Sequence, residues 1–291
     1  MIMENIIINP YDQFLSLEKT IHQEKLSVTT TFSPRLNAQF EDGGIGPTNV
    51  CLLGAKYGVG KTYFALNWML HSIREGKRVT FFSLDMDYRK ILIKILRNVL
   101  DVGKHEAIQI WKEDREYTRT KLKDAGYFDN LKIYTNEKRP ISFKEITQIT
   151  TEEKPDIVFI DHFGKIYGMG ANIYGETKII AEYLRQMKNK INTIFVPLIQ
   201  MKKGDTRMRS PNRIPPGKDE YKGAGEVGED ADIMLSLARP DLDQDCPEDR
   251  RLTIVGALRK NRLNDEPDIG YLFWRYDPKT TRMVDLTPIQ W

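Results

Sequence analysis

A glycine-rich segment, residues 54–62, has the side chains and backbone amides best suited to bind a phosphate group. Successive backbone N–H groups there can point at phosphate oxygens, and a following helix would add its partial positive charge. These amides belong to Gly58, Val59 and Gly60. We predict that Lys61 reaches the terminal phosphates of ATP and that the Thr62 hydroxyl binds Mg²⁺.

The context of this segment favours a nucleotide site over a chance match. A strand-like apolar run precedes it and an amphipathic helical pattern follows it, as a phosphate-binding loop requires. Gly54 and Gly58 lie in the same loop as the Gly-Lys-Thr sequence. Ala55 departs from the strict motif, which has glycine at that position. The combination predicts a P loop, the nucleotide-binding turn between a strand and a helix.

Asp161 is the candidate for a second magnesium-binding group. The run "PDIVFID" predicts a strand that ends at Asp161. Ligands of open α/β sheets bind at the carboxyl edge of the strands, where this carboxylate would emerge. We expect it to hold Mg²⁺ through water, opposite Thr62. Taken alone, the run is equally compatible with a strand that ends in a turn-favouring aspartate.

The elements that would position these residues alternate along the chain. Strand-like runs lie at residues 50–55, 78–84, 130–135, 156–161, 192–200, 232–238, 252–258 and 271–277. Helical patterns fill the early gaps, at residues 62–75, 88–100, 143–152 and 177–190. This order predicts an α/β fold with a doubly wound, mainly parallel sheet. The last three strands follow one another without helices, so we expect an antiparallel addition at one edge.

Composition sets wide limits on function. With 291 residues, of which 40% are hydrophobic and 29% charged, the chain is ordinary for a soluble globular protein. The net charge of +3 is too small to indicate nucleic acid by itself. Cys51 and Cys246 form neither a disulfide framework nor a metal-ligand spacing, which predicts a reducing, cytoplasmic compartment. The first residues do not resemble a signal peptide, and no apolar run approaches the roughly 18 residues of a membrane span.

Residues 1–30 are predicted to form an arm that precedes the main domain at 31–291. Asn9 and Pro10 suit the start of a helix, because asparagine caps helices and proline fits the first turn. Tyr11, Phe14 and Leu15 would then share one helical side. The helix could pack on its own domain or dock on a neighbouring subunit.

Several stretches together resemble the hexameric replicative helicases of the DnaB type. They are "TTFSPRLNAQFEDGGIGP", "GAKYGVGKTYFALN", "VTFFSLDM", "IVFIDHF", "VPLIQMKK", "GEDADIMLSLARP" and "LRKNRLNDEPDIG". The resemblance covers roughly residues 30 to 285, and that family also begins its loop with Gly-Ala, which accounts for Ala55. It implies a RecA-like P-loop NTPase core. Because only about 30 residues precede the core, we expect a phage-encoded motor without the family's primase-binding N-terminal domain.

The resemblance implies roles for four further residues. Asp85 stands where the helicases have the glutamate that orients the attacking water, with Asp87 as a less favoured substitute. Gln200 matches the glutamine that senses the γ-phosphate or DNA. Lys260 and Arg262 match the pair that reaches across a subunit interface as an arginine finger. Without the resemblance, "RKNR" after a strand is more often a solvated basic turn, although phosphoryl transfer favours a rigid planar cation.

A basic segment that follows the sensor strand is the candidate DNA-binding loop. Residues 202–222 contain proline and glycine without an apolar period, which predicts a long loop. Its proposed DNA-binding residues are Lys202, Lys203, Arg207 and Arg209. Basic groups there would follow the phosphate backbone in a salt-sensitive, sequence-independent way, and a solvated loop is the alternative. Residues 167–177 are a second channel-loop candidate, whereas the acidic segment 240–251 predicts a surface hairpin that does not touch DNA.

These features together predict an ATP-dependent, ring-shaped DNA helicase, expected to be hexameric, that translocates on single-stranded DNA in replication. A RecA-type recombinase or strand-annealing ATPase would instead form filaments. A helicase-loading or regulatory ATPase would bind a partner ring, and a small-molecule kinase is disfavoured because no lid segment is evident. The expected partners are single-stranded DNA, further copies of the chain, and the primase or polymerase of the same replisome. The expected location is the cytoplasm of a bacterial host.

Overall fold

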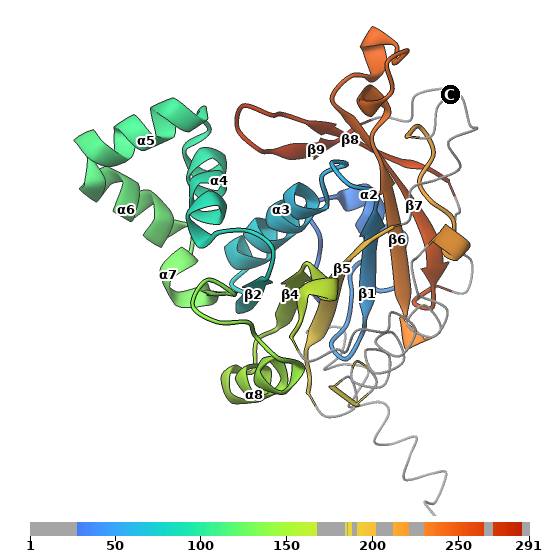
Figure 1. The fold of residues 1–291 in the computed structure, drawn as a ribbon, viewed down its shortest axis with the longest axis horizontal. Helices are drawn as coiled ribbons and strands as arrows, with labels where there is room; N and C mark the ends of the chain where they lie inside the picture. Colours follow the sequence, from blue (N-terminus) through green and yellow to red (C-terminus); the bar gives the residue numbers. More distant parts are fainter. Residues whose placement is uncertain are drawn as a thin grey trace, which may run out of the picture.

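Parallel strand pairing organises the computed structural model of this chain (Figure 1). The structure describes residues 28–167, 184, 186–187, 191–201, 212–220, 230–264 and 270–286. Within these residues, nine strands form one sheet in the order β3-β2-β4-β5-β1-β6-β7-β8-β9. In chain order the strands are β1 Cys51–Ala55, β2 Val79–Ser83, β3 Leu131–Thr135, β4 Ile157–Asp161, β5 Ile194–Gln200, β6 Ile233–Ala238, β7 Thr253–Asn261, β8 Leu272–Tyr276 and β9 Met283–Asp285.

The pairing confirms the predicted mainly parallel sheet with antiparallel strands at one edge. Neighbours from β3 to β6 in this order pair in parallel. Neighbours from β6 to β9 pair antiparallel. Strand β6 therefore belongs to both parts, because it is parallel to β1 and antiparallel to β7. The purely antiparallel addition begins at β7, one strand later than the sequence indicated.

The helices cover both faces of the parallel part. The described α-helices are α2 Pro34–Asn37, α3 Lys61–Arg74, α4 Tyr88–Leu100, α5 Lys104–Glu113, α6 Arg115–Asp124, α7 Tyr127–Asn130 and α8 Phe143–Glu153. The predicted helices at 62–75, 88–100 and 143–152 correspond to α3, α4 and α8. Figure 1 shows α5 and α6 projecting away from the sheet, and neither was predicted.

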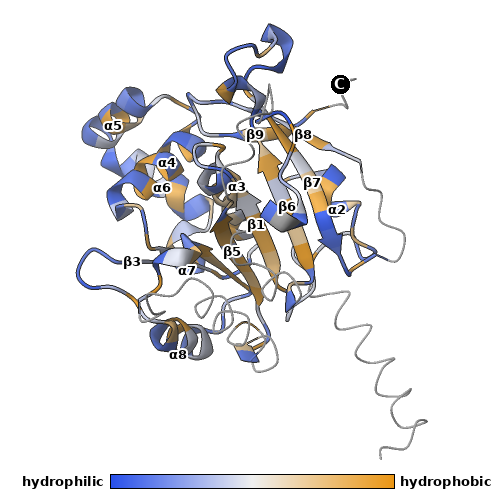
Figure 2. Ribbon diagram, turned by 45° about the vertical axis from the view of Figure 1, so that its right-hand side comes forward, coloured by the Kyte–Doolittle hydropathy of each residue, from blue (hydrophilic) through white to orange (hydrophobic). Residues whose placement is uncertain are grey.

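Successive residues of the central strands face two separate hydrophobic layers. Leu53 and Phe159 pack toward α3, where the Trp68 ring meets the Phe159 ring edge to face with centroids 5.5 Å apart. Leu52 lies in the opposite layer with Ile146 of α8. All five residues of β1, β2 and β4 are buried, as expected for strands covered on both faces. Figure 2 shows the neighbouring central strand β5 in the hydrophobic colours, whereas α5 is largely hydrophilic.

Some predictions fall outside the described residues. The predicted arm at 1–30 is described only from residue 28, and the channel-loop candidate at 167–177 only at Tyr167. Of the helix predicted at 177–190, Leu184, Gln186 and Met187 are described as helical. The proposed DNA-binding residues, Lys202, Lys203, Arg207 and Arg209, also lie outside the described part of the chain. The acidic segment 240–251 joins antiparallel β6 and β7, as predicted, through two short 3-10 turns.

Candidate nucleotide site at the carboxyl edge of the sheet

The P loop leaves the carboxyl end of β1 and enters α3 at Lys61. Its turn depends on two glycines with positive φ, Gly58 at 78° and Gly60 at 115°. Glycine adopts these angles without the steric cost that a side chain would add. A Cβ on Gly60 would also lie 3.3 Å from Ile254 Cδ1, whereas none of the described atoms lies within 4 Å of a Cβ on Gly58. The loop can therefore turn tightly and present its backbone closely to a ligand.

Three predicted site residues meet at the start of α3. The Thr62 hydroxyl donates a 2.6 Å hydrogen bond to Asp161 Oδ2, and Lys61 Nζ donates to the Ala55 carbonyl oxygen at 3.1 Å. Asp161 ends β4 and is only 7% exposed. Burial raises the pKa of Asp161, while the Thr62 hydrogen bond and the Lys61 charge oppose that rise. Burial lowers the pKa of Lys61, and the charges of Asp161 and Asp85 counteract it.

These residues fit the magnesium nucleotide that the motif implies. A buried carboxylate and a hydroxyl lie together beside a lysine and a loop whose glycines leave room for a close ligand. Among the described residues, no group of three or more His, Cys, Asp or Glu side chains could hold a metal ion. Thr62 and Asp161, which contact each other, would hold Mg²⁺ together with oxygens of the nucleotide itself. The bound ion would neutralise charge on the phosphates.

Asp85 and Asp87 have different environments, although they are two residues apart. Asp87 is the N-cap of α4, and its Oδ1 accepts the Arg89 backbone N–H at 2.7 Å. Asp85 has a 58% exposed side chain, and its Oδ1 lies 3.8 Å from Lys165 Nζ. Burial lowers the pKa of Lys61, and the Asp85 charge, after that of Asp161, opposes this lowering. Asp85, together with Asp161, therefore acts on the charge of the P-loop lysine, whereas Asp87 caps α4.

Gln200 ends β5 directly beside the P loop. It pairs in register with Ala55, and the next residue, Met201, donates its backbone N–H to the Ala55 carbonyl at 3.0 Å. The side-chain Oε1 of Gln200 lies 3.3 Å from Nε2 of His162. Sequence reasoning missed His162, and the available signal was its position immediately after Asp161. Burial and the Lys61 charge lower the pKa of His162, which favours a neutral ring.

Lys260 and Arg262 lie at the opposite edge of the sheet. Because β7 runs antiparallel to β6, its start contacts the P loop through Ile254, and its end pairs Asn261 with Ile233 at the amino edge. Arg262 follows that end, with its side chain 53% exposed and one guanidinium nitrogen 3.9 Å from Asp232 Oδ1. The structure therefore does not bring Lys260 and Arg262 to the P loop of their own chain.

The described segment 212–220, downstream of the basic residues, is fixed by contacts that the sequence did not reveal. Asn212 Nδ2 donates to Asp243 at 2.7 Å, and Arg213 forms a 2.9 Å ion pair with Asp245. Arg259 of β7 donates to the Pro216 carbonyl at 2.9 Å. The acidic connection between β6 and β7 therefore holds this segment against the sheet.

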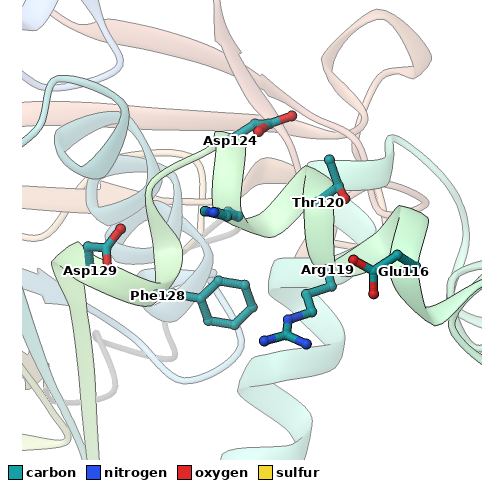
Figure 3. A pocket seen from close by; sticks show the side chains of 7 residues that line it. Glu116, Arg119, Thr120, Asp124, Phe128 and Asp129 are labelled. Atoms are coloured by element: carbon teal, nitrogen blue, oxygen red, sulfur yellow. The ribbon is translucent and has the colours of Figure 1, made fainter.

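A surface cavity of about 610 Å³ lies on α6 and α7, away from the P loop (Figure 3). Its walls carry both charge signs, from Glu116, Asp124 and Asp129 and from Arg119 and Lys123. The ring of Phe128 lies among them and is 56% exposed. The cavity contains none of the predicted site residues, so it is separate from the nucleotide site.

No helix in the described ranges is both long and apolar enough to span a bilayer.

Residues 28–283 match the family described as the DnaB-like helicase C terminal domain. Among curated proteins, the replicative DNA helicase DnaB of Helicobacter pylori is 23% identical over 260 residues, covering 87% of this chain and 52% of the relative. A probable plasmid replicative DNA helicase of Chlamydia trachomatis is 24% identical over 289 residues, covering 89% of this chain and 61% of the relative.

Solved structures agree on the fold. One of them, an isolated ATPase domain, superposes with a TM-score of 0.78 at 18% identity, covering 96% of this chain and 99% of that one. A DnaB-like replicative helicase studied with its primase interactions gives a TM-score of 0.72 at 20% identity, covering 95% and 66%. The chain spans about half the length of the Helicobacter relative. From the P-loop geometry, the RecA-like sheet and the match across residues 28–283, the chain belongs to the DnaB-like helicase C-terminal domain family.

Proposed function

We propose that this chain is the ATP-hydrolysing motor of a replicative DNA helicase and that it works as a hexameric ring on single-stranded DNA. Family membership and the replicative helicases among its relatives support this function. The main structural support for the proposal is the distance between two sets of charged groups in the chain. Lys61, Thr62 and Asp161 lie at one edge of the sheet, while Lys260 and Arg262 lie at the other.

Each group would have a defined task in hydrolysis. The P-loop amides and Lys61 would hold the phosphates, and Thr62 with Asp161 would hold Mg²⁺. Asp85 would orient the attacking water, the role implied by its match to the glutamate of the related helicases. Arg262 would complete the site of a neighbouring chain, because its position excludes contact with the phosphates bound by its own chain. A heterologous contact of this kind closes into a ring when its rotation allows.

Single-stranded DNA is the proposed track. Gln200 ends β5 beside the P loop, and the chain continues through Met201 directly into the basic residues Lys202 and Lys203. Charge of this kind would bind the phosphate backbone without reading sequence. Since one structural relative was studied for its interactions with primase, the primase or polymerase of the same replisome is a further candidate partner. We place the active protein in the cytoplasm, where such a replisome works.

Electron microscopy of the purified chain with a non-hydrolysable ATP analogue and oligo-dT tests this proposal. Closed six-membered rings, together with ATP hydrolysis that oligo-dT accelerates, are the expected result. Open filaments would instead indicate a recombinase or strand-annealing ATPase. Monomers that hydrolyse ATP without any response to DNA would contradict the helicase proposal.

A further inference from the structure

We propose that His162 is a positioning residue that orients the side-chain amide of Gln200, and that DNA can accelerate hydrolysis only while Gln200 is held this way. The inference rests on the proposed function, because it assigns a new residue to the coupling between DNA and ATP. Three observations carry it: the hydrogen bonds of the His162 ring, their effect on Gln200, and the place of both residues between the P loop and the basic segment.

The ring of His162 is fixed on both sides. The backbone N–H of Gly164 donates to Nδ1 at 3.1 Å, so this nitrogen acts as an acceptor and carries no proton. A neutral imidazole then has its proton on Nε2. That nitrogen lies 3.3 Å from Oε1 of Gln200 and can donate to it. The Gly164 contact therefore selects the tautomer that binds Gln200.

This contact decides which end of the Gln200 amide is available for other partners. Because Oε1 accepts from His162, the two amide N–H groups are left to donate. The terminal torsion of glutamine is broad, so an unrestrained amide exchanges its oxygen and nitrogen at little cost. An amide turned the other way would present its oxygen to a phosphate and would be repelled. His162 thus keeps a donor, and not an acceptor, available beside the P loop.

Both residues lie between the proposed magnesium ligand and the start of the proposed DNA-binding segment. His162 follows Asp161, which contacts Thr62. Gln200 pairs with Ala55 at the start of the P loop and is three residues from Lys203. The His162–Gln200 contact therefore joins the end of β4, which carries the proposed magnesium ligand, to the end of β5, which leads into the proposed DNA-binding segment.

Substitution of His162 tests the coupling role. His162→Phe should reduce the stimulation of ATP hydrolysis by oligo-dT about tenfold, because it removes one hydrogen bond between neutral groups. The KM for ATP should stay within about twofold of the wild-type value. His162→Gln should recover at least about a third of the stimulation, because its amide nitrogen can replace Nε2 as donor. The exposed histidine of α5 provides the matched control, and His105→Phe should behave like the wild type.

A double variant separates coupling from general damage. If the two residues act as one unit, Gln200→Ala combined with His162→Phe should be no slower than Gln200→Ala alone. Additive losses would overturn the inference, and so would undiminished stimulation in His162→Phe.

A spectroscopic readout needs no nucleotide. The chain has four histidines, so ¹⁵N spectra of histidine-labelled protein are simple, and His162→Phe identifies the His162 signals. We expect a neutral ring protonated on Nε2, with a signal that shifts in Gln200→Ala. A proton on Nδ1, or a signal unmoved by Gln200→Ala in an ATP-hydrolysing protein, would overturn the inference alone. Absence of hydrolysis in the wild type would overturn the proposed function and the coupling role with it.

Discussion

Lys61 and Asp161 lie in a buried site that disfavours charge, and each favours the charged form of the other. Burial lowers the pKa of the lysine and raises that of the aspartate, and each charge opposes the shift of the other. The Thr62 hydroxyl supports the ionised aspartate by a hydrogen bond of 2.6 Å.

Removal of either charge should therefore abolish hydrolysis. For Lys61→Ala and Asp161→Ala we expect a fall in turnover of at least about a hundredfold, the cost typical of removing an electrostatic interaction with the transition state. Circular dichroism should show an unchanged fold. Lys144→Ala, on an exposed position of α8, is the matched control. Turnover at a substantial fraction of the wild type would contradict the site assignment.

The two neighbouring aspartates should respond differently to the same change. Asp85→Asn should abolish hydrolysis and retain ATP binding, because an amide cannot accept a proton from the attacking water. Asp87→Asn should remain active, since asparagine caps a helix about as well as aspartate. Turnover and nucleotide affinity measured on both variants check this. An inactive Asp87→Asn beside an active Asp85→Asn would reverse the assignment.

At the scale of elements, the strands and the P loop were predictable because their patterns are local. Buried strands such as β4 are continuous apolar runs, and the P loop combines its motif with a strand before and a helix after. Helices α5 and α6 were missed because only Ala107 and Thr118 are buried in them, which leaves almost no apolar period. The contacts of Asn212 with Asp243 and of His162 with Gln200 depend on tertiary packing, so no local pattern could indicate them.

The four proposed DNA-binding residues lie between two fixed points of the chain, Gln200 and Asn212. Neutralising these four residues, Lys202, Lys203, Arg207 and Arg209, should weaken binding to any single strand. The slope of log affinity against log salt should also become shallower by about 0.7 for each phosphate that is no longer neutralised. Titrations of labelled oligo-dT at several salt concentrations measure both quantities.

The control for this experiment removes the same charge elsewhere. Alanine at four exposed basic positions of α5 and α6 changes the net charge equally and should leave the slope unchanged. These positions are Lys112, Arg115, Arg119 and Lys121. Equal weakening by both quadruple variants would show that net charge, and not the basic segment, governs binding.

Helix α8 begins with a capping box that offers a stability test. Ser142 Oγ accepts the Glu145 backbone N–H, and Glu145 accepts the Ser142 backbone N–H at 2.9 Å. The backbone N–H and the hydroxyl of Ser142 both donate to the Glu145 carboxylate, and together with Arg139 they lower the pKa of Glu145 to about 2. Ser142→Ala should reduce the free energy of unfolding by about 1 kcal/mol, and Gln148→Ala on the exposed side of the helix by less than about 0.5 kcal/mol.

The capping box also has a pH signature. A lowered carboxyl pKa in the folded state stabilises the protein above the unfolded pKa, and this contribution is lost as the pH falls. The difference between wild type and Ser142→Ala should thus be full at neutral pH and should shrink as the pH falls from about 4.5, the ordinary value, toward about 2. Denaturant unfolding across this range measures it, and a constant difference would contradict the role of Glu145.

At the scale of the whole molecule, the proposed arginine finger of one chain should work with the P loop of a different chain. Arg262→Ala chains should bind ATP and hydrolyse it poorly, as should Lys61→Ala chains with an intact finger. In rings mixed at equal ratio, about a quarter of the interfaces would unite an intact loop with an intact finger, so turnover should recover toward a quarter of the wild-type value. An absence of recovery in rings shown to mix would argue against a finger supplied by the neighbour.

Strand β7 connects these two halves of the proposed machine. Near its start, Ile254 lies beside Gly60, and Arg262 follows directly after its end, roughly 26 Å away at about 3.3 Å per residue. Strand β7 pairs with β6 from Val255 to Asn261, with one irregularity at Arg259, and with β8 from Thr253 to Gly256. This pairing would fix the spacing between consecutive nucleotides around the ring. Evolution would then be free to lengthen or shorten the connection at 240–251. Within β7, an added or lost residue would change the distance between the P loop and Arg262 in every chain of the ring.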